Sequence, residues 1–516
     1  MPIETITRED PRYSTLIKGK NSRFPASESD AASRIELCEN VADVTLALQR
    51  AVSEGLRPTV RSGGHCYEDF VYSNPGGAIL DLSMFTDTTP LSGGPKYRVA
   101  AGAQLGGVYS DLFKRHNVTI PGGTCGSVAA GGHISGGGYG LLSRLHGLTS
   151  DWVSAVDILT VDANGKVVPR RVDHKHDPEL FRVCCGAGGG SFGIITNYFF
   201  DELPQVPQEV ITANISFSWL DMTEERFEAI LKTYGSYWET RGKDPDTWGM
   251  FTILGLTHRS SGHLGISIQF CNPDGTCNDL KVLNEFLGLF QPCKPVQTTP
   301  ATAAVTGGER AIYHATPEGC WGQQMLSRHL WLDANVRGGG GGGGAGGEQR
   351  AKYKSCYMKR NFSSAEIACF YKHLTSMVPG MDLSRTTVLT DSYGGAVNKK
   401  EMADTRGVPQ RGSVMKLQFI TYWNNEKDDS TYIEWMKEFF SELYSGPDAD
   451  PKYKETPFWN DHYEGCYINY PDKDMLAYPF WPQLYYGDQG LVPVLQRVKR
   501  RYDPNNIFHH AMSIRT

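Results

Sequence analysis

A histidine and a cysteine follow directly after a glycine turn in the stretch RPTVRSGGHCYEDF, residues 57–70. Gly63 and Gly64 have no side chains, so backbone N–H groups there can approach a bulky anion closely. The imidazole of His65 could act as a base, a metal ligand or a nucleophile. The stretch by itself leaves all three roles open.

A second glycine-rich segment, TIPGGTCGSVAAGGHISGGGYGLLSRLHGLTSDWV, covers residues 119–153. Its spacing does not match the dinucleotide fingerprint of a βαβ unit, and it does not match a P-loop. Many glycines with few charges favour a large, flat, mostly neutral ligand that carries a phosphate tail. A flavin dinucleotide fits that description.

Composition indicates a globular protein of two or three domains, because the chain has 516 residues, 40% of them hydrophobic and 21% charged. The net charge of -6 predicts no nucleic-acid partner. No apolar run approaches the roughly 18 residues of a membrane span, so no membrane association is expected. The start, MPIETITREDPRY, has no apolar core, which predicts a cytoplasmic protein, or a secreted one whose leader has been removed.

The elements that must position these residues begin with a mixed α+β part. Residues 39–55 have apolar positions at helical spacing and end at Gly55, which predicts a helix. Residues 78–85 predict a strand, and residues 96–117 a strand, a glycine turn and a second helix. Residues 152–169 predict a hairpin that turns at Asn164-Gly165.

The pattern changes after the proline-rich stretch ELPQVPQEV, at about residue 205. Alternating strands and amphipathic helices follow, which predict an antiparallel sheet with helices on one face. The predicted strands are residues 263–270, 385–394 and 413–423, and the predicted helices are residues 223–241, 364–378 and 428–445. We therefore expect three parts: a first domain at residues 1–205, a second domain at 206–464, and a C-terminal part of the first domain at 465–516, which packs back on it.

The chain has 12 cysteines, too few for a disulfide scaffold. The motif CNPDGTC, from Cys271 to Cys277, could close a small disulfide loop, and its spacing leaves that question open. The low-complexity stretch GGGGGGGAGG, residues 338–347, predicts a flexible surface loop.

Five motifs together resemble the berberine bridge enzyme-like family: VRSGGHCYEDF, PGGTCGSVAAGGHISGGGYG, GGGSFGIIT, YINYPDKD and YDPNNIFHHAMSI. They occur in the family's order along nearly the whole chain. The resemblance implies a vanillyl-alcohol oxidase type of fold, in which residues 1–205 and 465–516 form the FAD-binding domain and residues 206–464 the substrate domain. It also implies an FAD that is attached twice. The matching residues are His65, for the 8α-methyl carbon of the flavin, and Cys125, for its C6. On this interpretation His65 is an anchor rather than a base, and its neighbour Cys66 is a packing residue.

The resemblance also implies a set of residues around the cofactor. Ser62, Gly63, Gly64 and the run before His133 match the pyrophosphate-binding turns, and Gly193 and Ile195 match backbone contacts to the pyrimidine edge. The full predicted cofactor set is His65, Cys125, Arg61, Ser62, Gly63, Gly64, Gly122, Gly126, Val128, Gly131, Gly132, His133, Gly138, Gly193, Ile195, Asn469 and Asn506.

Val128 occupies the position that acts in the family as a gate for oxygen. Valine there is typical of oxidases and leucine of dehydrogenases, because the smaller side chain leaves room for O₂. The resemblance therefore implies an oxidase that transfers hydride from a substrate alcohol to flavin N5 and releases hydrogen peroxide.

Alcohol oxidation also needs a group that takes the hydroxyl proton. Tyr470 matches the family's base and Tyr139 a second active-site tyrosine. A free tyrosine has a pKa near 10, and a nearby cation would lower it. Lys416 and Gln418 lie two apart on a predicted strand and face the same side. They match a Lys-x-Gln pair of the family, and the resemblance implies that Lys416 is the cation and that Gln418 orders the substrate.

Three further tyrosines bear on the substrate pocket. Tyr393, in a loop that faces the flavin in relatives, is predicted to line the pocket together with Tyr139 and Gln418. Tyr463 and Tyr467 are interpreted as packing residues. No metal is expected at this site.

The resemblance is greatest to bacterial antibiotic-tailoring members such as glycopeptide hexose oxidases and aclacinomycin oxidoreductases. It implies O₂ and a small-molecule alcohol, a sugar hydroxyl first, as the reactants of a monomer or homodimer. Oxidative cyclisation or dehydrogenation of an alkaloid or polyketide is the alternative. A binding protein that retains its flavin as a relic is a third possibility, against which His65, Cys125, Val128 and Tyr470 all argue.

Overall fold

The computed structural model describes residues 3–91, 94–296, 310–316, 319–327, 349–447, 449–487 and 490–515. The polyglycine stretch at residues 338–347 lies outside the described residues, so the prediction of a surface loop there stays untested.

A four-stranded sheet forms near the N-terminus, with strand order β1-β2-β4-β3. The pair β1·β2 is antiparallel, whereas β4 runs parallel to both β2 and β3. Its strands are β1 (Glu4–Thr7), β2 (Arg34–Leu37), β3 (Pro58–Arg61) and β4 (Ala78–Asp81). Because β3 ends at Arg61, the turn that carries His65 begins at the end of this sheet.

Helix α2 (Val41–Ser53) covers this sheet and confirms the first helix predicted from the sequence. The side chain of Asn40 caps its N-terminus by accepting a hydrogen bond from the N–H of Asp43. Val44, Ala47, Leu48 and Ala51 are buried at the spacing of one helical face. The left-handed backbone of Gly55, with φ of +70°, ends the element.

A five-stranded antiparallel sheet follows, with strand order β5-β6-β9-β7-β8. The hairpin β7·β8 is the one predicted, with Gly165 at φ of +78° in its turn. The strands are β5 (Thr88–Pro90), β6 (Tyr97–Ala100), β7 (Val153–Val161), β8 (Val167–Asp173) and β9 (Ile194–Phe200), and the helices between them are α3 (Leu105–His116), α4 (Ala130–Ser135), α5 (Ser143–His146) and α6 (Pro178–Cys184).

The second half of the chain builds an eight-stranded antiparallel sheet of order β13-β14-β10-β12-β11-β16-β17-β15. Its strands are β10 (Glu209–Ser218), β11 (Met250–Thr257), β12 (His263–Phe270), β13 (Arg310–Thr316), β14 (Gly319–Ser327), β15 (Arg350–Met358), β16 (Thr386–Ser392) and β17 (Met415–Trp423). The three strands predicted here, β12, β16 and β17, all occur.

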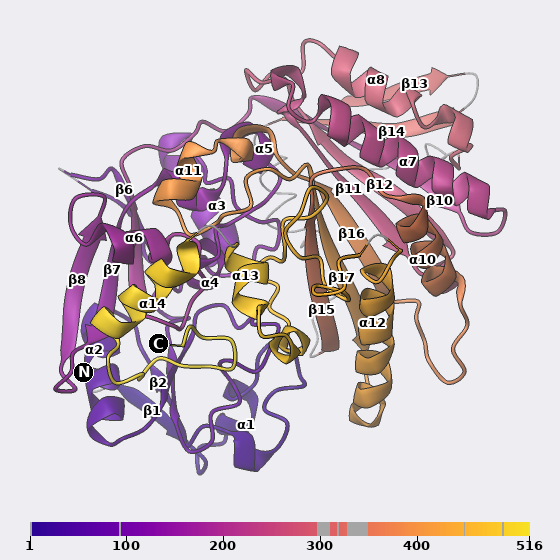
Figure 1. Ribbon diagram of the computed structural model, residues 1–516. Coiled ribbons are helices and arrows are strands. Elements are labelled where there is room, and N and C mark those ends of the chain that lie inside the picture. Colours follow the sequence, from indigo (N-terminus) through magenta and orange to yellow (C-terminus); the bar gives the residue numbers. More distant parts are fainter. Residues whose placement is uncertain are drawn as a thin grey trace.

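Three long helices lie along one face of this sheet, as Figure 1 shows: α7 (Glu224–Arg241), α10 (Ser364–Thr375) and α12 (Asp429–Leu443). They match the three predicted helices. Alternate residues of β17 divide between the two faces, because Phe419 packs on Phe439 and Phe440 of α12 whereas Lys416 and Gln418 face the opposite side. The sheet therefore separates its helical cover from the face that looks toward the N-terminal half.

The C-terminal segment returns to the N-terminal half, as predicted. In Figure 1 the yellow end of the chain lies against the indigo and purple elements. Lys499 on α14 (Leu491–Tyr502) donates to the carbonyl of Ser191 at 2.8 Å, and Phe508 joins the apolar core around α2. The shorter helices are α1 (Tyr13–Leu16), α8 (Lys281–Gly288), α11 (Glu401–Thr405) and α13 (Trp481–Tyr486).

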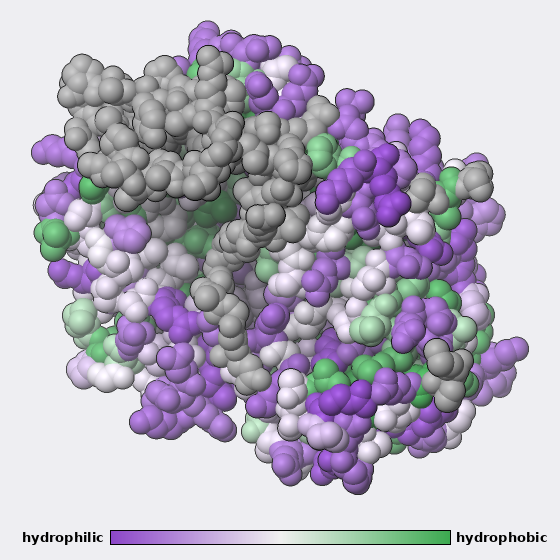
Figure 2. All heavy atoms as spheres, turned by 180° about the vertical axis from the view of Figure 1, so that it is seen from behind, coloured by the Kyte–Doolittle hydropathy of each residue, from purple (hydrophilic) through white to green (hydrophobic). Residues whose placement is uncertain are grey.

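Where the view from behind shows described residues, their surface is mostly hydrophilic or neutral, with hydrophobic residues in small groups (Figure 2). Among the described residues, no helix has both the length and the apolar character that a membrane span requires. Cys271 and Cys277 are both buried free thiols, so the small disulfide loop that the sequence left open is not formed in the structure.

Candidate active site

All three sheets contribute to a cavity of about 390 Å³ between the two halves of the molecule. Residues of β3, β7 and β9 line it from the N-terminal half, and residues of β11, β16 and β17 line it from the eight-stranded sheet. Glycine turns provide much of the first wall, whereas tyrosines and charged groups provide much of the second. A ligand in this cavity is contacted from both halves.

The two predicted anchor residues meet at one serine. The Nε2 atom of His65 lies 3.0 Å from the Oγ of Ser127, and the Sγ of Cys125 lies 3.4 Å from the same oxygen. Both side chains line the cavity. Burial, followed by the charge of Lys20, lowers the pKa of His65 to about 4, so its imidazole is neutral near pH 7. A neutral imidazole keeps a lone pair that can attack carbon.

Gly63, the first glycine of the turn before His65, is also required by the protein's own packing. A Cβ atom on Gly63 would lie 2.6 Å from the backbone nitrogen of Ala129, too close for any other residue. From the sequence, Gly63 was expected to let the backbone approach the pyrophosphate of the cofactor. The structure adds a second reason, because the turn carrying His65 passes directly over the segment that carries Cys125.

The loop that carries Cys125 is held by backbone hydrogen bonds to the start of α3. The N–H of Leu105 donates to the carbonyl of Val128 at 2.8 Å, and the N–H of Gly106 donates to that of Gly126 at 3.0 Å. His133 holds the other side of the loop, because its Nε2 accepts from the N–H of Gly123 at 3.0 Å. The loop therefore presents Cys125 to the cavity from a fixed position.

The lining fits a flavin dinucleotide at the glycine-rich wall. Gly132 lines the cavity, and a Cβ atom there would meet no protein atom within 4 Å. The space beside this backbone thus belongs to the cavity, and a ligand can approach it closely. Ser62, Gly63, Gly64, Gly131, Gly132, His133, Val128, Gly193, Ile195 and Asn469, all predicted around the cofactor, also line the cavity.

Lys416 is the centre of the opposite wall. Its Nζ lies 3.4 Å from the hydroxyl of Tyr470 and 3.0 Å from Oδ2 of Asp391. It also lies 4.1 Å from the centre of the Tyr139 ring and 5.2 Å from that of Tyr467. The two tyrosines that were predicted for the chemistry therefore share one ammonium group.

The expected effect of Lys416 on the tyrosines is not found. Burial, and then the negative charge of Asp391, raise the pKa of both Tyr470 and Tyr139 well above the usual value near 10. Sequence reasoning counted the ammonium of Lys416 but not the carboxylate of Asp391 that pairs with it. Burial in turn raises the pKa of Asp391, partly offset by Lys416. Both phenols are thus protonated at neutral pH.

Gln418 lies two residues beyond Lys416 on the same face of β17, as predicted, and its amide donates to the hydroxyl of Tyr67 at 2.9 Å. The ring of Tyr67 stacks on that of Tyr353 at 3.6 Å and approaches that of Tyr470 at 5.4 Å. This contact joins the loop that carries His65 to the strand that carries Lys416.

Buried ion pairs fix the segment that carries Tyr470. Lys352 on β15 contacts Glu68 at 3.1 Å and Asp472 at 2.7 Å, and Lys354 contacts Asp472 at 2.7 Å and Asp474 at 2.6 Å. Neither lysine is more than slightly exposed. The pairs link the loops on both sides of the cavity to one strand.

Several residues predicted to contact a ligand lie elsewhere. The guanidinium of Arg61 forms an ion pair with Asp81 on the neighbouring strand and donates a hydrogen bond to the carbonyl of Leu16, so it does not line the cavity. Tyr393 lies fully buried behind Tyr139, where its hydroxyl donates to the carbonyl of Gln410, so it does not line the pocket.

Four more of the predicted cofactor residues are absent from the cavity wall. Gly122 lies against the hydroxyl of Tyr109, and Gly138 lies against Thr149. Gly126 serves through its carbonyl in the loop of Cys125, and Asn506 occupies an exposed turn after α14. All four were predicted to lie near the flavin because they belong to the matched motifs. In the structure these residues face other parts of the protein or solvent instead of the cavity.

Sequence reasoning missed Tyr67, Asp391 and Tyr467, all of which line the cavity. Tyr467 was interpreted as a packing residue, whereas Tyr463 does lie outside the cavity, with its hydroxyl on Glu366. One signal was available for Asp391, because a carboxylate near the end of the apolar strand TTVLTDS requires a buried partner. Cys66 also lines the cavity, and burial raises the pKa of its thiol to about 12.

Two family models match the chain. One, described as an FAD binding domain, matches residues 32–169, and the other, described as berberine and berberine like, matches residues 466–515. The first match includes His65 and Cys125, and the second includes Tyr470. Both walls of the cavity therefore contain matched residues.

Whole-length relatives agree with these matches. The chain is 31% identical to the aclacinomycin-N/aclacinomycin-A oxidase of Streptomyces galilaeus, with 99% of this chain and 89% of that protein covered. It is 30% identical to the hexose oxidase of Chondrus crispus, with 99% and 95% covered. Among solved structures, glycopeptide hexose oxidase DBV29 complexed with teicoplanin matches with a TM-score of 0.85 at 30% identity, covering 100% of this chain and 99% of that one.

Proposed function

Because the chain belongs to the berberine bridge enzyme-like family of FAD-linked oxidoreductases, we propose that it oxidises a sugar hydroxyl, free or on a glycosylated natural product. O₂ is the proposed electron acceptor and hydrogen peroxide the second product. The names of the two relatives, a hexose oxidase and an aclacinomycin oxidase, support this choice of substrate class.

One observation carries the proposal. Tyr470, Lys416 and Gln418 line the cavity opposite the pair formed by His65 and Cys125. A ring attached to His65 and Cys125 at the glycine-rich wall would thus face the hydroxyl group of Tyr470, the ammonium of Lys416 and the amide of Gln418. These are the groups that a substrate alcohol needs to be bound and deprotonated.

We propose that FAD is attached through both His65 and Cys125. The neutral imidazole and the contact of both side chains with Ser127 support attachment at two neighbouring positions. Two attachments would hold the ring in one orientation and lower the entropy that is lost in each turnover. When bound, FAD supplies the acceptor for the substrate hydride at N5 and passes the electrons on to O₂.

The chain's own residues would manage the proton. Tyr470 is protonated at rest, so it can act as a base only from its phenolate form, which the ammonium of Lys416 at 3.4 Å would stabilise. Asp391 balances the ammonium when the phenol is neutral. Turnover is therefore expected to rise as the pH rises above neutral. Gln418 would order the substrate hydroxyl next to Tyr470.

Val128 supports the choice of O₂ as acceptor. It lines the cavity three residues after Cys125, and its backbone N–H donates to the carbonyl of Cys125 at 3.1 Å. Its side chain is thus held beside the proposed attachment point, where a valine leaves more space than a leucine.

The decisive experiment is a panel of hexoses, oligosaccharides and glycosylated polyketides with peroxide detection. Tyr470→Phe should lose most turnover and keep its bound flavin. Tyr478→Phe is the matched control, because the Tyr478 hydroxyl contacts Glu455 away from the cavity. Wild-type rates in Tyr470→Phe would disprove the assignment of Tyr470 as the base. If an alkaloid or polyketide is converted and no sugar yields peroxide, the oxidative cyclisation alternative is favoured. A purified protein that carries no flavin after denaturation would contradict both enzyme hypotheses, the sugar oxidase and the oxidative cyclisation.

A further inference from the structure

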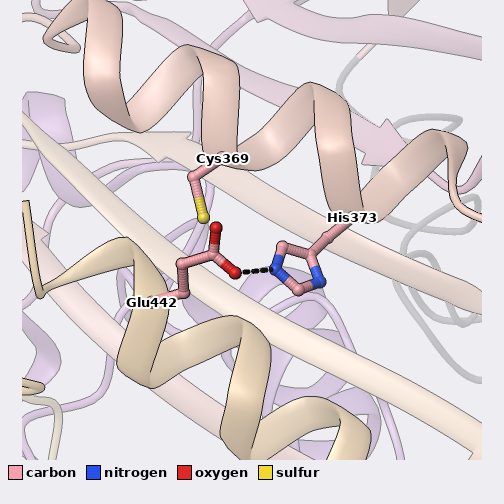
Figure 3. A group of neighbouring side chains, drawn as sticks. All are labelled: Cys369, His373 and Glu442. Atoms are coloured by element: carbon pink, nitrogen blue, oxygen red, sulfur yellow. Dashed lines mark hydrogen bonds and ion pairs between the residues drawn. The ribbon is translucent and has the colours of Figure 1, made fainter.

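A cysteine, a histidine and a glutamate come together on the outer helices of the eight-stranded sheet (Figure 3). Cys369 and His373 lie four residues apart on α10, so both side chains project from one face of that helix. Glu442 lies in the last turn of α12, which packs beside α10. In Figure 3 the carboxylate points between the thiol and the imidazole.

The donor atoms of these side chains are close enough to share one ion. One ligand atom from each residue lies within 4.8 Å of the other two. The Nε2 of His373 is 2.8 Å from Oε2 of Glu442. A tetrahedral ion with bonds of about 2.0–2.3 Å places its donor atoms about 3.3–3.8 Å apart. The imidazole and the carboxylate must therefore separate slightly and any wider donor pair must close by up to about 1 Å, which rotations of the side chains supply.

The surroundings fix two of the side chains and leave the third open. Cys369 and His373 are each 8% exposed, whereas the Glu442 side chain is 43% exposed. The imidazole stacks on the ring of Phe439 at 4.6 Å and meets that of Trp435 edge-on. Packing thus orients the imidazole, and a surface groove that includes Glu438 and Glu442 gives an ion access from solvent.

We propose that Cys369, His373 and Glu442 form a binding site for one zinc-class divalent cation. Thiolate and imidazole together favour Zn²⁺ over Mg²⁺ or Ca²⁺, which prefer oxygen ligands. Three protein ligands leave a fourth position for water, and Glu438, one helical turn before Glu442, lies beside the groove to bind that water.

Binding breaks the two contacts of Lys372 with Glu442 and the hydrogen bond that Nε2 of His373 donates to Oε2 of Glu442, and it releases one proton. The hydrogen on Nε2 of the neutral imidazole moves to Nδ1 by exchange with solvent, which frees the Nε2 lone pair for the ion. The thiol of Cys369 gives its proton to solvent and becomes a thiolate ligand. Lys372, which contacts both carboxylate oxygens of Glu442 at 2.7 Å, swings away. Its side chain is 58% exposed, and such surface ion pairs contribute little, so this competitor is weak.

An ion at this position would link α10 to α12 across the outside of the sheet. Because α12 packs on β15 and β17, the link would stabilise the cover of the strands that carry Lys354 and Lys416. Since the ion binds only the folded arrangement, the melting temperature should rise with its concentration.

The test uses the full-length holoenzyme without a histidine tag, treated with a chelator and then titrated with ZnCl₂. We expect one Zn²⁺ per chain by elemental analysis and a saturable calorimetric signal. X-ray absorption at the zinc edge should give one sulfur at about 2.3 Å and nitrogen or oxygen ligands at about 2.0–2.1 Å. Glu442→Gln should weaken binding at least tenfold, because the amide oxygen is a poorer ligand and carries no charge.

Glu434→Gln is the matched control, an exposed glutamate on the same helix outside the cluster. It should bind Zn²⁺ as the wild type does. Glu442 is a surface residue, so its variant should fold, which flavin content and circular dichroism can verify. Failure of the wild type to bind stoichiometric zinc would overturn the proposal, and so would equal affinity in Glu442→Gln or an absorption spectrum without sulfur.

Discussion

Acid should loosen the loop that carries Cys125, and His133 is the residue through which it acts. Burial, followed by the charge of Lys416, lowers the pKa of His133 to about 4 from an ordinary value of 6.5. Its Nε2 accepts a hydrogen bond from the N–H of Gly123, which requires that this nitrogen carry no proton. Protonation would place two donors against each other and break the contact.

The sign and size follow from this pKa. A group whose pKa is lowered by folding contributes stability above its unfolded value, and that stability is lost as the pH falls toward its folded value. Each unit of pKa corresponds to about 1.36 kcal/mol, so His133 contributes about 3.4 kcal/mol near pH 7. On the same scale, about 2 kcal/mol of this contribution is lost by pH 5.

The informative variant is His133→Gln. The oxygen of its amide can still accept from the N–H of Gly123, but it does not titrate, so the loop should stay in place without the acid sensitivity. The free energy of unfolding in urea should therefore fall by about 2 kcal/mol less between pH 7 and pH 5 than in the wild type. His176→Gln, which changes an exposed histidine whose side chain is 73% accessible, is the control.

Hydrogen exchange gives a local readout of the same effect. After correction for the intrinsic rate, the peptide that contains Gly123 should exchange faster at pH 5 than at pH 7 in the wild type, and equally fast in His133→Gln. His133→Phe, which does not titrate either but leaves that N–H unpaired, should be about 1–3 kcal/mol less stable than His133→Gln at both pH values. The reasoning is refuted if His133→Gln keeps the full pH dependence of the wild type.

Three other substitutions test the remaining parts of the site. His65→Ala should keep FAD attached through Cys125 but slow oxidation; release of all flavin on denaturation would contradict the double attachment. Val128→Leu should lower the rate of reoxidation by O₂ while an artificial electron acceptor still supports turnover, and an unchanged O₂ rate would refute the gate. Lys354→Met should lower the free energy of unfolding by about 3–5 kcal/mol, because it leaves Asp472 short of a buried partner; a loss below about 1 kcal/mol, measured by urea unfolding, would show that the pair is dispensable.

The fold could be predicted where local patterns and motif order carry the information. The α+β class and the vanillyl-alcohol oxidase type of fold are confirmed. The alternation in MKLQFITYW correctly placed Lys416 and Gln418 on one face of β17, because strand geometry decides that face without tertiary contacts. The domain boundaries at residues 205 and 464 stay a prediction.

The rest depends on contacts between distant segments. Asp391 becomes the partner of Lys416 only because β16 and β17 pair in one register, which the sequence of either strand does not reveal. Likewise Tyr67 meets Gln418, 351 residues further along the chain. Arg61 shows the opposite error, since a motif placed it at the cofactor while the parallel pairing of β3 with β4 gives it to Asp81.

The position of Tyr470 rests on charges rather than on apolar packing alone. Lys352 joins Glu68, 284 residues before it in the chain, to Asp472, 120 residues after it. Apolar side chains of similar size at these buried positions would be as stable or more so, since desolvation of the charges is costly. Apolar groups, however, can slide past one another, whereas paired charges at 2.7–3.1 Å allow few arrangements. The network therefore fixes the separation between the loop of His65 and the segment of Tyr470, between which the proposed substrate would fit.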